Sequence, residues 1–151
     1  ASAAFHDGSP VNADAVIANF ERWFNPESPL RGSGEYQGWK GGFLGFKGEV
    51  DAAGRPVSFY DGIEKVDNLT VLVHLNRPEP NLLSLLAQPP FAIANPAVLA
   101  SAGDSFGASA AATSGSGPYL VSEWAADHLT LTPNSKYWAT VPAETLTITL
   151  H

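Results

Sequence analysis

Four histidines are the side chains of this 151-residue chain best suited to hold a transition metal. They are His6, His74, His128 and His151. Zinc ligands usually come in close pairs, whereas these four are widely separated along the chain. The sequence has no cysteine, so thiolate metal sites and cysteine nucleophiles are excluded. We therefore expect structural or solvent-exposed roles for all four histidines, no metal site and no cofactor.

Serine, histidine and aspartate are present, but not in the patterns that support catalysis. The sequence contains no His-Glu-x-x-His helix and no glycine-rich phosphate loop with a lysine. Residues 115–117, Gly-Ser-Gly, precede a proline and predict a turn that opens a strand. Asp7 and Asp14 fit a turn and the first turn of a helix. We expect no catalytic residue and no enzyme; a hydrolase, the alternative, would depend on His6 or Ser116.

The first element that the sequence predicts is a turn followed by an amphipathic helix. Asp7 and Gly8 form a turn pair, and Asn12 can cap the helix that follows. Apolar residues then recur every three or four positions, which predicts a helix over residues 13–24 with one buried face. Asn25 and Pro26 end it.

The rest of the chain predicts short helices and antiparallel strands of an α+β fold. Residues 26–62 are rich in glycine and aromatic residues and predict a long loop, with short strands flanking a turn at 53–54. Alternation predicts strands at 63–66, 69–75, 119–124, 129–132 and 145–150, and Asn81 and Asn95 predict helices over 82–86 and 96–102. A Gly/Ala/Ser linker at 103–117 is the expected internal boundary.

Composition limits the partners. Fifteen acidic and eight basic residues give a net charge of −7, which excludes nucleic acid as a partner because phosphate binding needs clustered Lys and Arg. With 44% hydrophobic residues the chain can bury one sizeable core. Residues 1–4 lack the basic start and the apolar run of a signal peptide, and we expect no membrane-spanning segment because no stretch approaches eighteen apolar residues. Because the helix signature and the last strand lie so close to the two ends, we expect a piece of a longer protein.

Three blocks in the same order along the chain resemble one protein family. Residues 5–16, Phe-His-Asp-Gly-Ser-Pro-Val-Asn-Ala-Asp-Ala-Val, are similar to the Phe-His-Asp-Gly-Thr-Pro-Val-Thr-Ala-Asp-Asp-Val pattern of the family-5 extracellular solute-binding proteins, with mild departures at Ser9 and Asn12. Residues 115–119, Gly-Ser-Gly-Pro-Tyr, match the family's Gly-Thr-Gly-Pro-Tyr turn. Residues 67–78 resemble the strand ahead of its proline-rich helix.

The resemblance implies a fold and a function. Such receptors serve bacterial ABC importers for dipeptides, oligopeptides and nickel, and have two lobes around a cleft. The chain would be a fragment of the first lobe of this type II periplasmic-binding-protein-like fold: residues 1–112 a small α+β subdomain, and residues 113–151 strands that return to the lobe's main sheet. It would bind a peptide or other small solute without catalysis, in the periplasm or at the cell surface, with the second lobe and the ABC transporter permease as partners.

The same resemblance implies candidate ligand-binding residues. Tyr36 and Trp39 lie in the loop from which family members send an aromatic side chain into the cleft; the alternative is that they cover the subdomain's own core. Phe43 and Phe46 are expected to pack in that core. Where the nickel receptors carry an arginine, this chain has Gln88 followed by two prolines, which disfavours nickel.

Three alternatives stay open at this point. Two alternatives concern the ligand, which would be a nickel chelate or an oligosaccharide instead of a peptide. The chain would alternatively be an interaction module, an isolated or split lobe whose exposed strand edge at residues 145–150 pairs with a complementary chain.

Overall fold

The computed structural model describes residues 3–141 and 144–150, and the chain divides into two compact units. We call residues 12–93 the aromatic unit, and residues 1–11 with 94–151 the polar unit. The family resemblance implies another boundary, between residues 112 and 113. That boundary separates parts of a complete receptor lobe, and it stays a prediction. No helix in the described part of the chain is long and apolar enough to cross a bilayer.

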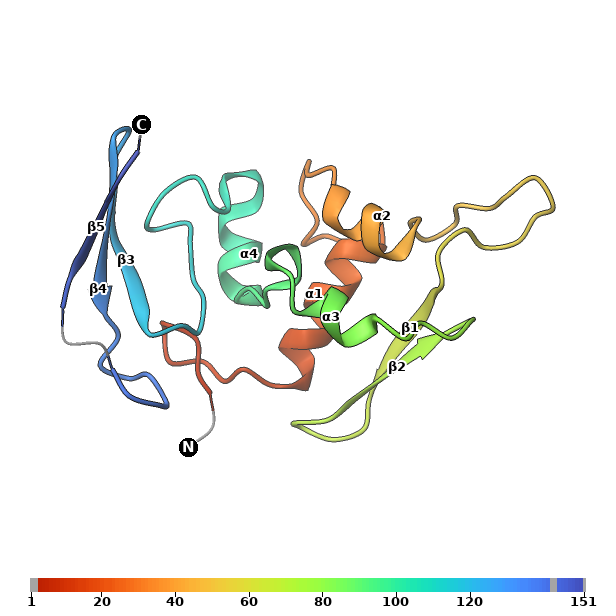
Figure 1. Cartoon of the computed structure of the whole chain (residues 1–151), viewed down its shortest axis with the longest axis horizontal. Helices are drawn as coiled ribbons and strands as arrows, with labels where there is room; N and C mark the ends of the chain where they lie inside the picture. The colour runs from red at the N-terminus through yellow and green to blue at the C-terminus, as the bar shows by residue number, and fades with distance from the viewer. Residues whose placement is uncertain (1–2, 142–143, 151) are drawn as a thin grey trace. The chain divides into compact units, whose positions relative to one another are not determined.

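The aromatic unit combines three helices with one hairpin (Figure 1). Its elements are α1 (Ala13–Phe24), α2 (Gln37–Phe43), β1 (Tyr60–Lys65), β2 (Val71–Leu75), α3 (Leu82–Leu86) and the 3-10 helix η1 (Pro89–Phe91). The two strands pair antiparallel, with a bulge between Tyr60 and Gly62. The hairpin packs against α1, which gives the unit a helical layer over a two-stranded sheet.

Helix α1 begins and ends where the sequence predicts. The side chain of Asn12 accepts a hydrogen bond from Ala15 N at 3.0 Å, which satisfies a free amide of the first turn. Asp14 lies in that turn and forms an ion pair with Lys65 of β1 at 2.8 Å. The helix closes at Asn25, whose backbone N–H donates to Glu21 O, and the face toward the core carries Phe20 and Trp23.

Buried aromatic rings form the core of the aromatic unit. The cluster consists of Phe20, Trp23, Trp39, Phe43, Phe59, Tyr60 and Phe91. Most of its ring pairs are tilted or T-shaped, the arrangement that the ring quadrupole favours, and Trp39 stacks on Phe43 at 4.1 Å. Removing one such buried ring costs roughly 3–5 kcal/mol, so these contacts hold the helices and the hairpin together.

Helix α2 lies within the segment that the sequence predicts to be a loop. Three of its seven residues are glycines, which disfavour a helix on propensity alone. Two of them permit close packing: a Cβ at Gly38 would lie 2.4 Å from Pro90 Cβ, and one at Gly42 would lie 2.7 Å from Leu85 Cδ1. The helix forms because these glycines let it approach η1 and α3, a tertiary contact that local patterns do not reveal.

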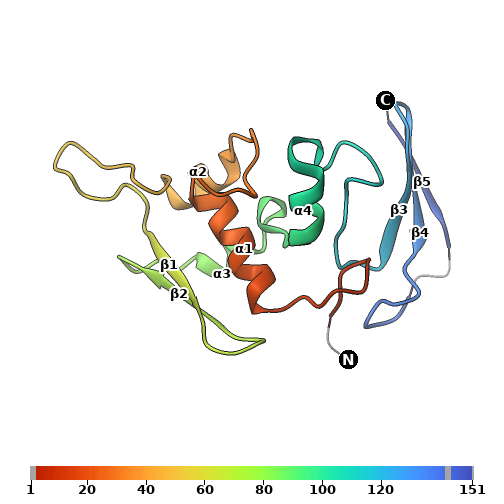
Figure 2. The ribbon, with the colours of Figure 1, turned by 180° about the vertical axis from the view of Figure 1, so that it is seen from behind.

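The polar unit contains α4 (Pro96–Ala102), the 3-10 helix η2 (Gly103–Ser105) and a three-stranded sheet. The sheet has the order β3 (Tyr119–Trp124), β4 (His128–Pro133) and β5 (Leu146–Thr149), all antiparallel, as both views show (Figure 2). Asn95 caps α4 by accepting from Ala97 N at 2.9 Å, as the sequence predicts. The α+β fold with antiparallel sheets and short helices is thus confirmed.

Hydrogen bonds tie the N-terminal turn to the rest of the polar unit. Buried Asn95 donates from Nδ2 to Asp7 Oδ2 at 2.7 Å and to Ser9 Oγ at 3.2 Å. His6 N donates to Gly115 O at 2.9 Å, and the imidazole lies between Gly115 N at 3.4 Å and Gly117 O at 3.3 Å. The two most specific sequence blocks therefore meet through backbone and side-chain hydrogen bonds, which gives both a structural role.

Apolar side chains remain uncovered on the sheet of the polar unit. Every residue of β5 is exposed, and Ile148 keeps 45% of its surface in contact with solvent. Trp124, at the end of β3, is 41% exposed. Buried apolar residues in the described part of this unit are few, namely Phe5, Ala94 and Leu99. Polar contacts therefore carry much of its cohesion.

Candidate functional site

Tyr36 occupies an unusual backbone position at the start of α2. It adopts the left-handed conformation (φ 51°, ψ 45°), as does Leu44 at the other end of the helix (φ 74°, ψ −25°). A non-glycine residue in this region carries backbone strain of order 1 kcal/mol, and such residues cluster at functional sites. The two ends of α2 are thus fixed in conformations that the surrounding structure must maintain.

Two arginines hold the Tyr36 side chain. Arg22 Nε donates to the phenol oxygen at 2.8 Å, and the phenol donates to the backbone oxygen of Arg31. The guanidinium carbons of Arg31 and Arg22 lie 4.4 and 5.3 Å from the centre of the tyrosine ring. Cation–π attraction and hydrogen bonding act together here, so the ring is positioned on both its face and its edge.

Arg31 connects this tyrosine to the end of α1. Its Nη1 donates to Trp23 O at 2.7 Å and to Arg22 O at 3.2 Å, carbonyls that the helix leaves without partners in its last turn. Its guanidinium also lies 4.4 Å from the centre of the Phe46 ring. Partial burial lowers the pKa of Arg31 from its ordinary range, and the group stays charged at neutral pH. Arg31 therefore orders the loop from α1 to Phe46.

The structure places the two predicted ligand-binding residues differently. Trp39 is buried in the aromatic core, with 2% of its surface exposed, and its indole N–H donates to Gly45 O at 3.0 Å. Tyr36 is half-buried at the edge of that core. Phe43 is completely buried and Phe46 partly so. Within this chain Tyr36 alone of the two predicted residues has substantial side-chain surface to offer a ligand.

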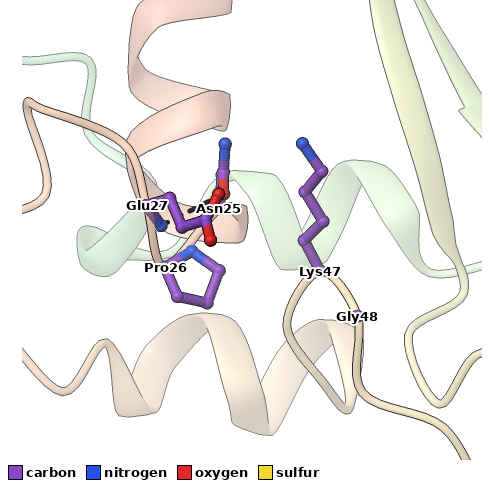
Figure 3. Close-up of a pocket in the computed structure, with 5 residues that line it drawn as sticks. All are labelled: Asn25, Pro26, Glu27, Lys47 and Gly48. Atoms are coloured by element: carbon purple, nitrogen blue, oxygen red, sulfur yellow. Dashed lines mark hydrogen bonds between the residues drawn. The ribbon is translucent and has the colours of Figure 1, made fainter.

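A small hollow lies at the end of α1, between the residues that follow the helix and those that follow Phe46 (Figure 3). It has a volume of about 330 Å³ and is lined by Asn25, Pro26, Glu27, Lys47 and Gly48. The backbone N–H of Lys47, the residue after Phe46, donates to Phe24 O at 3.0 Å and so fixes one wall to the helix. Figure 3 shows the lysine ammonium and the Asn25 amide pointing the same way. The hollow thus presents one cation, one carboxylate and one amide.

The histidines described by the structure contact carboxylates or backbone. His74 Nε2 lies 3.5 Å from Glu64, His128 lies 2.7 Å from Asp127 and 3.4 Å from Glu123, and the His6 ring lies near the backbone of Gly115 and Gly117. No group of three or more His, Asp or Glu side chains suited to a metal occurs among residues 3–141 and 144–150. His151 lies outside the described residues.

The carboxylates around His128 change its protonation. Hydrogen bonds that the His128 ring donates to Asp127, and to a smaller extent to Glu123, raise the pKa of His128 above its ordinary value. The same contact lowers the pKa of Asp127. The three groups lie on exposed surface of the β3–β4 hairpin, where they form an ion pair at mildly acidic pH.

Arg22 and Arg31 are the site residues that sequence reasoning missed. They lie 14 and 5 residues before Tyr36, and neither belongs to a recognisable motif. One available signal was the position of Arg22 in the last turn of a predicted helix, where cations are favoured by the helix dipole. The contact of both arginines with one tyrosine depends on the loop conformation, which spacing does not predict.

Comparison with known proteins gives consistent similarities. The model for bacterial extracellular solute-binding proteins, family 5, middle region, matches residues 2–149. The chain is 31% identical over 135 residues to the glutathione-binding protein GsiB of Pectobacterium atrosepticum, covering 89% of this chain. It is 32% identical over 139 residues to the probable D,D-dipeptide-binding periplasmic protein DdpA of Escherichia coli K12, covering 90% of this chain.

A solved structure shares the fold. The periplasmic binding protein AgaA of A. tumefaciens R10, solved in complex with agropinic acid, superposes on all of this chain with a TM-score of 0.74 and 22% identity. The chain spans 26% of that protein and 22% of the length of each of the two curated relatives.

Proposed function

The chain belongs to family 5 of the bacterial extracellular solute-binding proteins, and we propose that it contributes part of the ligand-binding lobe of a peptide receptor. The proposed receptor delivers its cargo to an ABC importer and has no catalytic activity. Its partners are a second lobe, which closes over the ligand, and the transporter permease. Its location is the periplasm or the cell surface. The two curated relatives, named for glutathione and D,D-dipeptides, support a peptide over a nickel chelate or an oligosaccharide.

The observation that carries the proposal is the fixed position of Tyr36. A tyrosine in the left-handed region, held by Arg22 and Arg31, presents a ring whose orientation costs no further entropy when a ligand binds. An aromatic surface suits a receptor for several peptides, because it provides contact area without requiring one particular side chain. We propose that Tyr36 contacts the peptide and that Trp39, buried behind it, holds α2 in place.

Calorimetric titration of the receptor that contains this chain tests the peptide assignment. We expect heat on titration with di- and oligopeptides, and binding about tenfold weaker after Tyr36→Ala because a buried aromatic contact is lost. Trp138→Ala is the matched control, since Trp138 is exposed in the polar unit. Peptides that give no heat, together with a nickel chelate or an oligosaccharide that does, would refute the peptide assignment.

A second candidate function rests on the uncovered sheet of the polar unit. Trp124, Leu146 and Ile148 expose apolar surface, and β5 has one unpaired edge in the described structure. We propose that this sheet continues into the main sheet of the complete lobe; an isolated chain would use the same edge to pair with a second chain. Size-exclusion chromatography over a wide concentration range distinguishes these cases, since a strict monomer argues against self-pairing.

A further inference from the structure

A second hollow lies in the aromatic unit, away from the residues around Tyr36 in sequence. It has a volume of about 590 Å³, within the range of small-molecule sites. Part of its lining comes from the turn that the bridge between Val50 and Pro56 closes. The rest comes from the first residues of β1 and from the residues that follow β2. The residues relevant here are Asp51, Arg55, Val57, Asp61, Asn76 and Arg77.

Two of its charged groups neutralise each other. Asp51 Oδ2 accepts from Arg55 Nε at 2.9 Å and lies 2.8 Å from Arg55 Nη2. Asp51 Oδ1 accepts from the backbone N–H groups of Ala53 at 2.8 Å and Arg55 at 3.0 Å. These bonds lower the pKa of Asp51. Asp51 and Arg55 therefore form a rim with no net charge for a ligand.

Two other charges in the same hollow are not satisfied in this way. The Arg77 guanidinium carbon lies 5.1 Å from the centre of the Phe59 ring, within cation–π range. Within the described part of the chain neither Arg77 nor Asp61 forms an ion pair, with the other or with a third residue. The hollow therefore offers one cation and one anion that are separate from each other.

Asn76 adds an amide of fixed orientation to the lining of the same hollow. Its Nδ2 donates to Ser58 O at 2.8 Å, which fixes the orientation of the side chain and leaves the amide oxygen as an acceptor. Its backbone N–H donates to Phe59 O at 3.0 Å, so the strand end is held as well. Val57 contributes apolar surface to the same hollow.

We propose that this hollow binds a small amphoteric ligand, an α-amino acid with a short aliphatic side chain. The ligand carboxylate pairs with the fork of Arg77, whose guanidinium already lies within cation–π distance of Phe59. The ammonium donates to Asp61 and to the Asn76 amide oxygen, and the side chain contacts Val57. Both charges of the ligand are needed, because each unsatisfied group of the hollow matches one of them. The inference does not depend on the proposed peptide receptor.

Titration of the ¹⁵N-labelled chain followed by NMR tests the proposal with three probes. L-alanine carries both charges, acetate the anion alone and methylammonium the cation alone. We expect L-alanine to shift the amide signals of Asp61, Asn76 and Arg77 and to bind about fivefold more tightly than either single-charge probe, because exposed ion pairs contribute modestly. Equal affinity for acetate and L-alanine, or shifts elsewhere in the chain, would overturn the proposal.

Charge-removing variants identify the groups involved. Arg77→Gln is expected to weaken L-alanine and acetate about fivefold and to leave methylammonium unchanged, whereas Asp61→Asn weakens L-alanine and methylammonium but not acetate. Lys136→Gln removes one exposed positive charge from the polar unit and should change none of the three affinities. A dispersed spectrum verifies folding of each variant. If Arg77→Gln and Lys136→Gln act alike, long-range electrostatics explains the binding and the site is refuted.

Discussion

The aromatic unit and the polar unit achieve cohesion by different means. In residues 12–93, large rings from three helices and a hairpin pack into one buried cluster. In the polar unit, buried asparagines connect turns and helix ends, while the sheet leaves Trp124 and Ile148 largely in solvent. Burial of apolar surface is the main stabilising contribution to folding, and hydrogen bonds add a smaller net amount each.

This difference suggests how the two units divide the work. The aromatic unit buries enough surface to hold a strained residue such as Tyr36 in a fixed position. The polar unit carries the residues that most clearly mark the family, yet these residues bond within the unit: His6 bonds to Gly115, and Asp7 accepts from Asn95. The signature that identifies the chain therefore belongs to the framework, and the proposed ligand contact belongs to a loop without a strong signature.

The largest effect is expected from opening the aromatic core. Trp39→Ala should lower the free energy of unfolding by roughly 3–5 kcal/mol, because it removes a ring 2% exposed and packed against Phe43. Urea denaturation followed by far-UV circular dichroism measures the change. Trp138→Ala, at a ring 55% exposed, serves as the control and should cost less than about 0.5 kcal/mol. Similar losses for the two variants would remove the distinction between the units.

The next effect concerns the hydrogen bonds of the polar unit. Asn95→Ala should cost roughly 1–2 kcal/mol, because it removes the cap of α4 and the hydrogen bonds that the buried Asn95 amide donates to Asp7 and Ser9. Hydrogen exchange of the α4 and 5–9 amides reports the loss locally. Asn81→Ala is the matched control, since Asn81 precedes α3 without a side-chain cap bond. Equal changes at both asparagines would contradict the role assigned to Asn95.

Local patterns account for most of the fold and little of the site. Asn12 and Asn95 predict their helices correctly, because an N-cap is a local interaction. Alternating residues predict all five strands to within a few residues. Helix α2 could not be predicted, because Gly38 and Gly42 are useful there through contacts with Pro90 and Leu85, far along the chain. The arginines that hold Tyr36 were missed because their contacts with it depend on the loop conformation, which residue spacing does not reveal.

A smaller effect is expected from the uncovered sheet. Ile148→Ser should change the stability of the chain by less than about 0.5 kcal/mol, because the side chain is already 45% exposed. It should instead reduce any concentration-dependent association, which analytical ultracentrifugation detects. A destabilisation above 2 kcal/mol would mean that β5 is part of a buried core and would weaken the comparison between the units.

The smallest effect is a pH dependence of the β3–β4 hairpin. Because the folded pKa of His128 is raised, its ion pairs stabilise the hairpin below the ordinary histidine pKa of about 6.5, and this contribution is lost as pH rises through the folded value. Because the folded pKa of Asp127 is lowered, its contribution is present above the ordinary aspartate pKa of about 3.9 and is lost on further acidification.

The hairpin should therefore be best protected between about pH 4 and pH 6.5. An NMR titration of the His128 ring measures this directly, and Asp127→Asn should lower its midpoint toward the ordinary value. An unchanged midpoint in Asp127→Asn would show that the aspartate does not stabilise the imidazolium.

The most direct test of the account is a peptide titration of the receptor that carries this chain, comparing Tyr36→Ala with Trp138→Ala. The account predicts that Tyr36→Ala weakens peptide binding about tenfold while Trp138→Ala, at an exposed residue of the polar unit, leaves the affinity unchanged. Peptide affinity that falls with Trp138→Ala and survives Tyr36→Ala would contradict it.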